Sequence, residues 1–97
     1  MKFDEIYSEL AKTNGVESTD RIESTFEFTC GWIRTRISLV VDRELIQIYT
    51  LTKARKTDQL TSLMNIPFEK VKSIAIASGC IRFMTDCNGV EGVVFFN

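Results

Sequence analysis

The cysteines and a few carboxylates are the side chains of this sequence best suited to catalysis. Cys30 begins a Cys-Gly-Trp segment of the kind that can hold a nucleophile, and Asp86 and Glu91 are the one acidic pair that a predicted hairpin places face to face. A nucleophilic thiol needs a neighbouring base and a lowered pKa, but the sequence contains no histidine. Cys30 also alternates with two phenylalanines on a predicted apolar face. We therefore expect structural cysteines, no catalytic residues and no enzymatic activity.

Metal and cofactor binding also lacks a recognisable ligand pattern. Cys30, Cys80 and Cys87 form no CxxC pair, and the sequence has neither a calcium-loop spacing of acidic residues nor a glycine-rich phosphate loop. Cys80 and Cys87 are separated by roughly 23 Å if their segment is extended, so they cannot bond to each other. We expect reduced thiols, no metal site and no cofactor.

Length and composition predict one domain, residues 1–97. The chain is 44% hydrophobic and 26% charged, with a net charge of −1, which is ordinary for a globular protein and gives no field that would steer it to nucleic acid. No apolar run approaches the roughly 20 residues of a membrane span, and the N-terminus lacks a signal-peptide core. We expect a cytoplasmic protein that binds no nucleic acid.

The N-terminal residues predict the one helix of the chain, over Phe3–Thr13. Four apolar residues recur at helical spacing and form one stripe: Phe3, Ile6, Tyr7 and Leu10. Asn14-Gly15 supplies a stop signal. Because a helix of about three turns is marginal alone in water, we expect its stripe to pack on a sheet.

From residue 26 onward, apolar and polar residues alternate with the period of a strand. Gly31 breaks the first run, and we interpret it as a bulge. The next two runs predict a hairpin around Arg43-Glu44, with Asp42 opposite Leu45. The predicted core face of this hairpin consists of Ile37, Leu39, Val41, Ile46 and Ile48.

Asn88-Gly89 is the strongest turn signal in the sequence. A type I′ turn needs positive φ at both central residues, which this dipeptide tolerates. A two-residue turn there pairs Phe83 with Val94 and Ile81 with Phe96. The predicted core face of the last hairpin is Ile81, Phe83, Cys87, Val90, Val94 and Phe96.

One helix followed by antiparallel strands predicts an α+β fold. Residues 17–21 are polar and unpatterned, which indicates a linker, and residues 59–66 fit a strand or a helical turn equally well. The predicted architecture is a strongly bent antiparallel sheet or a small β-barrel. The alternative is a cystatin-like arrangement, in which one helix lies across a curved antiparallel sheet.

Three segments in the second half of the chain follow a familiar order. Ile66–Ile74 gives an Ile-Pro-hydrophobic-acid turn between strands, Ile81–Phe96 gives a hairpin, and Tyr49–Lys53 precedes them as a further strand. This order resembles bacterial pleckstrin-homology-like and GRAM-like domains, and the resemblance implies a small PH-like β-barrel. Those families end in a helix that closes one end of the barrel, whereas here the predicted helix precedes the strands.

The main basic cluster lies in a connection between two strands. Lys53, Arg55 and Lys56 form it, and Arg36 lies on the neighbouring hairpin. Because a basic loop in PH-like domains can receive an anionic head group, the resemblance implies an anionic-ligand or lipid site at these four residues. Asp58 in the same loop and the slightly acidic chain favour an ordinary solvated loop instead.

Six apolar residues fall on faces opposite the predicted core: Trp32, Tyr49, Leu51, Met84, Val93 and Phe95. A helix of about eleven residues cannot cover both faces of a sheet of this size, so either the sheet closes on itself as a barrel or an apolar surface is left for a partner. We predict a non-enzymatic binding or adaptor domain that acts through protein–protein contact and forms a homodimer or homo-oligomer. Peripheral binding of an anionic ligand is the alternative.

Overall fold

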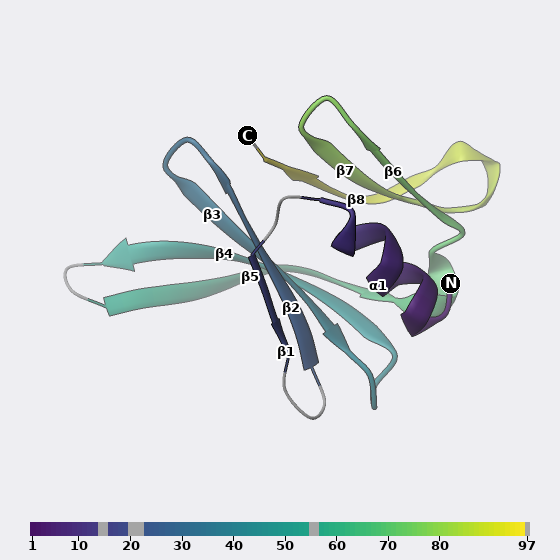
Figure 1. Cartoon of the computed structure of the whole chain (residues 1–97), viewed down its shortest axis with the longest axis horizontal. Helices are drawn as coiled ribbons and strands as arrows, with labels where there is room; N and C mark the ends of the chain where they lie inside the picture. The colour runs from purple at the N-terminus through teal and green to yellow at the C-terminus, as the bar shows by residue number, and fades with distance from the viewer. Residues whose placement is uncertain (14–15, 20–22, 55–56, 97) are drawn as a thin grey trace.

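The computed structural model describes the backbone of residues 1–13, 16–19, 23–54 and 57–96. Within these ranges, side chains are described for all residues except 16–19, 23, 52–54, 57–60, 62 and 63. The fold is α+β, with one N-terminal helix and two antiparallel sheets (Figure 1). No helix in these ranges has the length and the apolar character needed to cross a membrane.

Helix α1 spans Phe3–Ala11 and packs through its apolar stripe, as predicted. Ile6 and Leu10 are fully buried, while the rings of Phe3 and Tyr7 lie at the edge of the same cluster. The Tyr7 ring is 5.5 Å from that of Phe26 in strand β2. The helix is therefore held by burial of its stripe against the first sheet, because so short a helix has little stability of its own.

The first sheet contains five strands in sequence order. They are β1 (Val16–Thr19), β2 (Glu23–Cys30), β3 (Ile33–Val40), β4 (Leu45–Ala54) and β5 (Thr57–Pro67). The second sheet contains β6 (Ser73–Ala77), β7 (Cys80–Met84) and β8 (Val90–Phe95), and a 3₁₀ turn at Phe68–Lys70 joins it to the first. Figure 1 shows the two sheets as separate layers with α1 at one end.

The core lies between the inner faces of the two sheets and α1. Its buried side chains alternate along the strands, as period-two patterning requires. They include Phe26, Phe28, Ile37, Leu39, Ile46, Ile48, Ile66, Ile81, Phe83 and Val94. Strand β8 approaches the first sheet so closely at Gly92 that a Cβ there would lie 2.6 Å from Met64 Sδ. Among the described strands, no pairing joins the two sheets into a closed barrel.

Both predicted hairpins form, but with a register shifted by two residues. Ile37 lies opposite Ile48 and Leu39 opposite Ile46, because residues 41–44 form a longer turn than the predicted two-residue one. A shift of two keeps each strand residue on its predicted face. Val41, expected in the core, lies in the turn and is 43% exposed.

The last hairpin departs from its predicted turn in a similar way. Ile81 pairs with Val94 rather than with Phe96, and Phe83 with Gly92. The turn is built by Cys87 and Asn88, which have φ of 62° and 61°, while Gly89 has φ of −70°. The predicted core positions of Cys87 and Val90 are wrong: both side chains are exposed, because the longer turn and a register irregularity after Phe83 remove them from the inner face.

Three other segments differ from the sequence-based assignment. Residues 16–19, inside or beside the predicted linker, form strand β1 and pair with β2. The ambiguous residues 59–66 are strand, as part of β5. Gly31 is not a bulge: with φ of 60° it begins the tight turn that joins β2 to β3.

Candidate interaction surface

The outer face of the second sheet, which points away from the core, is largely apolar. It consists of Ala75 and Ala77 in β6, Arg82 and Met84 in β7, and Val93 and Phe95 in β8. Phe95 is 61% exposed and Val93 is 39% exposed, whereas Ile81 and Phe83 on the inner face of the same sheet are fully buried. An exposed phenylalanine beside an exposed valine on a flat sheet face is unusual for a surface that contacts only water.

Arg82 is the charged side chain at the centre of this outer face, and Glu91 in β8 is exposed toward the end of it. Arg82 lies directly opposite Val93 on β8 and opposite Ala75 on β6. Cys80 shares the face but is only 4% exposed, between its cross-strand neighbours Ala77 and Phe95. The face therefore presents one large aromatic ring, aliphatic side chains and a central cation, with one carboxylate toward its end. Aromatic residues, methionine and arginine are enriched in protein interfaces.

Trp32 occupies a separate site, at the turn between β2 and β3. Its side chain is 102% exposed, and the following residue, Ile33, is 55% exposed. The turn extends beyond the first sheet (Figure 1), so nothing in the described part of the chain covers the ring. Trp32 was predicted as an interface residue and is exposed, but it does not belong to the outer face of the second sheet.

Leu51 and Tyr49 are the two predicted interface residues that lie on the first sheet. Leu51 is only 5% exposed, so the prediction that it forms part of an accessible surface is wrong. It belongs to β4, a central strand flanked by β3 and β5, and Arg34 is its neighbour on β3. Tyr49 is half-buried, and its hydroxyl donates a 2.6 Å hydrogen bond to Gln47 Oε1. This face is thus polar and largely covered by its own side chains.

A charge cluster on the outer face of the first sheet involves Arg36, one of the predicted anion ligands. Glu27 in β2 accepts hydrogen bonds from Arg36 Nη2 at 2.8 Å and from Arg34 Nη2 at 3.5 Å. Arg36 is therefore already paired with a carboxylate. The other three predicted ligands, Lys53, Arg55 and Lys56, lie outside the residues whose side chains are described.

The pKa of Glu27 is lowered, chiefly by its hydrogen bond to Arg36, and burial opposes this shift only in part. A carboxyl group whose pKa is lower in the folded chain stabilises the fold above its unfolded pKa, and this contribution is lost as pH falls through the folded value. We expect Glu27→Gln to lower the free energy of unfolding by about 1 kcal/mol at pH 7, the scale for partly exposed pairs, and to have little effect near pH 2. Urea unfolding at both pH values measures this.

Glu9→Gln is the matched control for Glu27→Gln. Glu9 pairs with Lys12 at 3.0 Å on the exposed surface of α1, where an ion pair contributes about 0.3–0.5 kcal/mol. An equal loss of stability in the two variants at pH 7 would contradict a special role of the Glu27 cluster.

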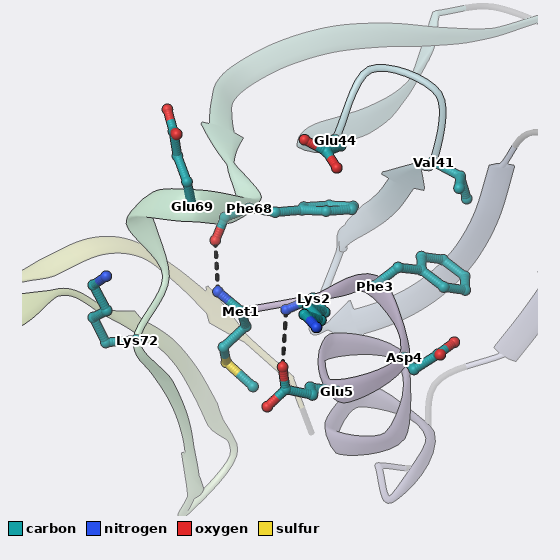
Figure 2. A pocket seen from close by; sticks show the side chains of 10 residues that line it. All are labelled: Met1, Lys2, Phe3, Asp4, Glu5, Val41, Glu44, Phe68, Glu69 and Lys72. Carbon is teal, nitrogen blue, oxygen red and sulfur yellow. Dashed lines mark hydrogen bonds between the residues drawn. The ribbon is translucent and has the colours of Figure 1, made fainter.

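An open groove lies at the start of α1, between the two sheets (Figure 2). The N-terminal ammonium of Met1 donates hydrogen bonds to the carbonyl oxygens of Phe68, at 2.8 Å, and Val71. The groove is lined by both signs of charge, from Lys2, Asp4, Glu5, Glu44, Glu69 and Lys72. Because the four carboxylates are largely offset by two lysines and the Met1 ammonium, the groove does not concentrate a strong field for one kind of ion.

The cysteines and the acidic pair considered for catalysis lie at separate positions in the fold. Cys80 is buried, Cys30 is half-exposed and Cys87 is exposed, and all three are free thiols. Asp86 lies in the turn after β7 rather than opposite Glu91, so the predicted face-to-face acidic pair is wrong. Both carboxylates line a shallow groove together with Lys70 and Lys72. In the described part of the chain, no three potential ligands gather as a metal site.

The sequence matches no protein-family model, and no curated protein or solved structure compared with it is significantly similar.

Proposed function

We propose that this chain is a non-enzymatic binding domain that acts through protein–protein contact and that associates with itself. The observation that carries the proposal is the outer face of the second sheet, where Val93 and Phe95 are exposed although the opposite face of the same strand is buried. Placing apolar surface in water costs about 25 cal/mol for each Å². A partner that covers Phe95 and Val93 recovers that free energy.

The exposed Trp32 supports the same proposal from a second position. Tryptophan is enriched among the few residues that dominate binding energy in protein interfaces. Its neighbour Ile33 extends the apolar tip of the β2–β3 turn. The two surfaces belong to different sheets, so the side chains of one can be truncated while the other is left unchanged.

The resemblance to pleckstrin-homology-like and GRAM-like domains belongs to this proposal, as does a cytoplasmic location. In support, the segments that carry the resemblance form a strand, a 3₁₀ turn and the second antiparallel sheet, in the expected order. Helix α1 packs at one end of the two sheets. The anionic-ligand alternative gains no support, because Arg36 is paired with Glu27.

The test removes the apolar side chains of the outer face and measures association. We expect the double variant Val93→Ala/Phe95→Ala to keep its fold and to lose at least about tenfold in affinity, since two interface anchors contribute about 1–2 kcal/mol or more. Light scattering measures self-association, and an interaction screen with immobilised chain captures other partners, whose affinities are then measured for both proteins.

Val41→Ala is the matched control, because Val41 is a similarly exposed aliphatic residue in the β3–β4 turn of the first sheet. We expect it to leave association unchanged. A wild-type chain that is strictly monomeric and captures no partner would overturn the proposal, as would a double variant that binds the captured partners as tightly as the wild type does.

A further inference from the structure

Strand β6 has one edge that no described strand covers. It spans Ser73–Ala77, pairs with β7 alone and is the first strand of its sheet. Figure 1 shows it at the border of the second sheet. Backbone N–H and C=O groups along such an edge are a ready template for a further strand, and Ser73, Ala75 and Ala77 along it are all exposed.

β6 lacks the features that usually protect a sheet edge. Its five residues, Ser-Ile-Ala-Ile-Ala, include no charge and no proline, and its pairing with β7 is regular. The other terminal strands differ: β1 contains Glu17, β5 contains Asp58 and ends at Pro67, and β8 contains Glu91 and an irregular register. Charge, proline and irregular register are the means by which edges avoid further pairing. β6 is thus the least protected edge among the described strands.

We propose that β6 pairs antiparallel with β6 of a second copy of this chain, about a two-fold axis at Ala75. The inference rests on the proposed self-association and specifies a contact at the β6 edge, separate from the Val93 and Phe95 side chains on β8. Residues opposite each other in an antiparallel pair share a face of the sheet. The inner faces of both copies therefore lie on the same side of the joined sheet only if one residue pairs with its own copy across the axis.

The axis at Ala75 uses all five residues of β6. Ser73 then lies opposite Ala77 of the partner subunit, and Ile74 opposite Ile76 of the partner subunit. Moving the axis by one residue brings either Lys72 or the turn at Ser78-Gly79, with φ of 53° and 72°, into the paired segment. The strand is thus complementary to itself in one register.

The side chains of this arrangement are compatible across the axis. Ile74 and Ile76 are half-buried at the border of the core, and pairing would cover them further, with one isoleucine beside another. On the outer side the small side chain of Ala75 meets its own copy, and no charge faces a like charge. The outer faces of the two copies then lie side by side, and the Phe95 side chains on β8 stay outside the edge contact.

The size of the contact sets the expected strength. Five paired residues extend along about 17 Å of sheet edge, which is less surface than the roughly 800 Å² per partner of a standard stable interface. We therefore expect a chain that is monomeric at low micromolar concentration and dimeric at several hundred micromolar.

Disulfide trapping tests the register. In a Cys30→Ser/Cys87→Ser background, which keeps the buried Cys80, we expect Ala75→Cys to form an interchain disulfide under mild oxidation. Opposed residues in an antiparallel pair have Cα atoms about 4.5–5.5 Å apart, within the range that a disulfide spans. Ser73→Cys is the control: its two copies lie four residues apart along the strands, about 13 Å, and should not react. Equal cross-linking at both positions, or none at Ala75→Cys, would overturn the proposal.

Ala75→Glu tests the same axis by repulsion. Within one chain the new carboxylate lies opposite Arg82, which favours the monomer fold, but across the axis two carboxylates meet. We expect the dimer dissociation constant, measured by sedimentation, to rise at least about fivefold. Thr29→Glu is the matched control, because Thr29 is exposed and lies opposite Arg34 in the first sheet. An unchanged constant for Ala75→Glu would contradict the axis.

The two proposals fail in distinguishable ways. If the wild-type chain associates but Ala75→Cys does not cross-link, the edge pairing is wrong and the proposed function stands. If the wild-type chain stays monomeric while Ala75→Glu abolishes capture of another protein, a strand of that protein pairs with the β6 edge. The proposal that a second copy of this chain pairs there is then wrong. If the wild-type chain neither associates nor captures a partner, both proposals are wrong.

Discussion

Phe83→Ala is expected to lower the free energy of unfolding by about 3–5 kcal/mol, the usual cost of truncating a buried phenylalanine. Phe83 is fully buried on the inner face of β7, with Ile74 and Gly92 as its cross-strand neighbours. No side chain from Gly92 is available to fill the space that the ring leaves. Urea or thermal unfolding of the purified variant measures the loss, which is a large fraction of the stability of a small domain.

Phe95→Ala is the matched control, because the same residue type lies in the same sheet on the opposite face. Phe95 is 61% exposed, so its truncation should change stability by less than about 1 kcal/mol. Comparable losses for the two variants would mean that the inner and outer faces of the second sheet are assigned wrongly, and would remove the basis for the proposed interaction surface.

Gly79→Ala is expected to cost about 2–4 kcal/mol. Gly79 has φ of 72° in the turn between β6 and β7, which an L-residue adopts at a cost of about 1–2 kcal/mol. A Cβ at this position would also lie 2.6 Å from the carbonyl oxygen of Phe96. Because that oxygen belongs to the backbone, the end of the chain must move, which weakens the 2.8 Å hydrogen bond from Phe96 N to Gly79 O.

Gly31→Ala separates the cost of a positive φ from the cost of the close contact with Phe96. Gly31 has φ of 60°, but a Cβ there would meet no atom within 4 Å, so only the backbone cost of about 1–2 kcal/mol applies. Equal unfolding free energies for Gly31→Ala and Gly79→Ala would show that the close approach of the C-terminal residues to the β6–β7 turn does not contribute to stability.

The sequence was sufficient to predict which side of β3, β4, β7 and β8 faces the core, but not the exact pairing. Alternation alone determines the face, and the two shifts of register were both of two residues, which leave faces unchanged. The turns caused these shifts: Glu44 and Cys87 adopt positive φ, which neither residue type signals. A Gly89 that follows Asn88 suggested the shorter turn, yet it has negative φ in the folded chain.

The polar edge strand could not be predicted from its own residues. β1 has no apolar alternation, because it pairs with β2 at the border of the first sheet and its sequence, Val-Glu-Ser-Thr, resembles a linker. The ambiguity of residues 59–66 has a related cause: the pairing of β4 with β5 shifts register beside Ile48 and Tyr49, which interrupts the period of two.

The candidate surface was predicted in part. Val93 and Phe95 are on the outer face of the second sheet as expected, and Trp32 is exposed. Leu51 was misplaced, because residue type does not reveal that a central strand can bury a side chain on its outer face among its neighbours. The unprotected edge of β6 was not identified either, since strand order within a sheet follows only from the tertiary structure.

The most direct test of self-association through the second sheet is the molar mass of the wild-type chain as a function of concentration. Sedimentation from low micromolar to several hundred micromolar should show a rise from the mass of one chain toward that of two, and Ala75→Glu should shift the rise to higher concentration. A mass that stays at one chain over the whole range would contradict the account.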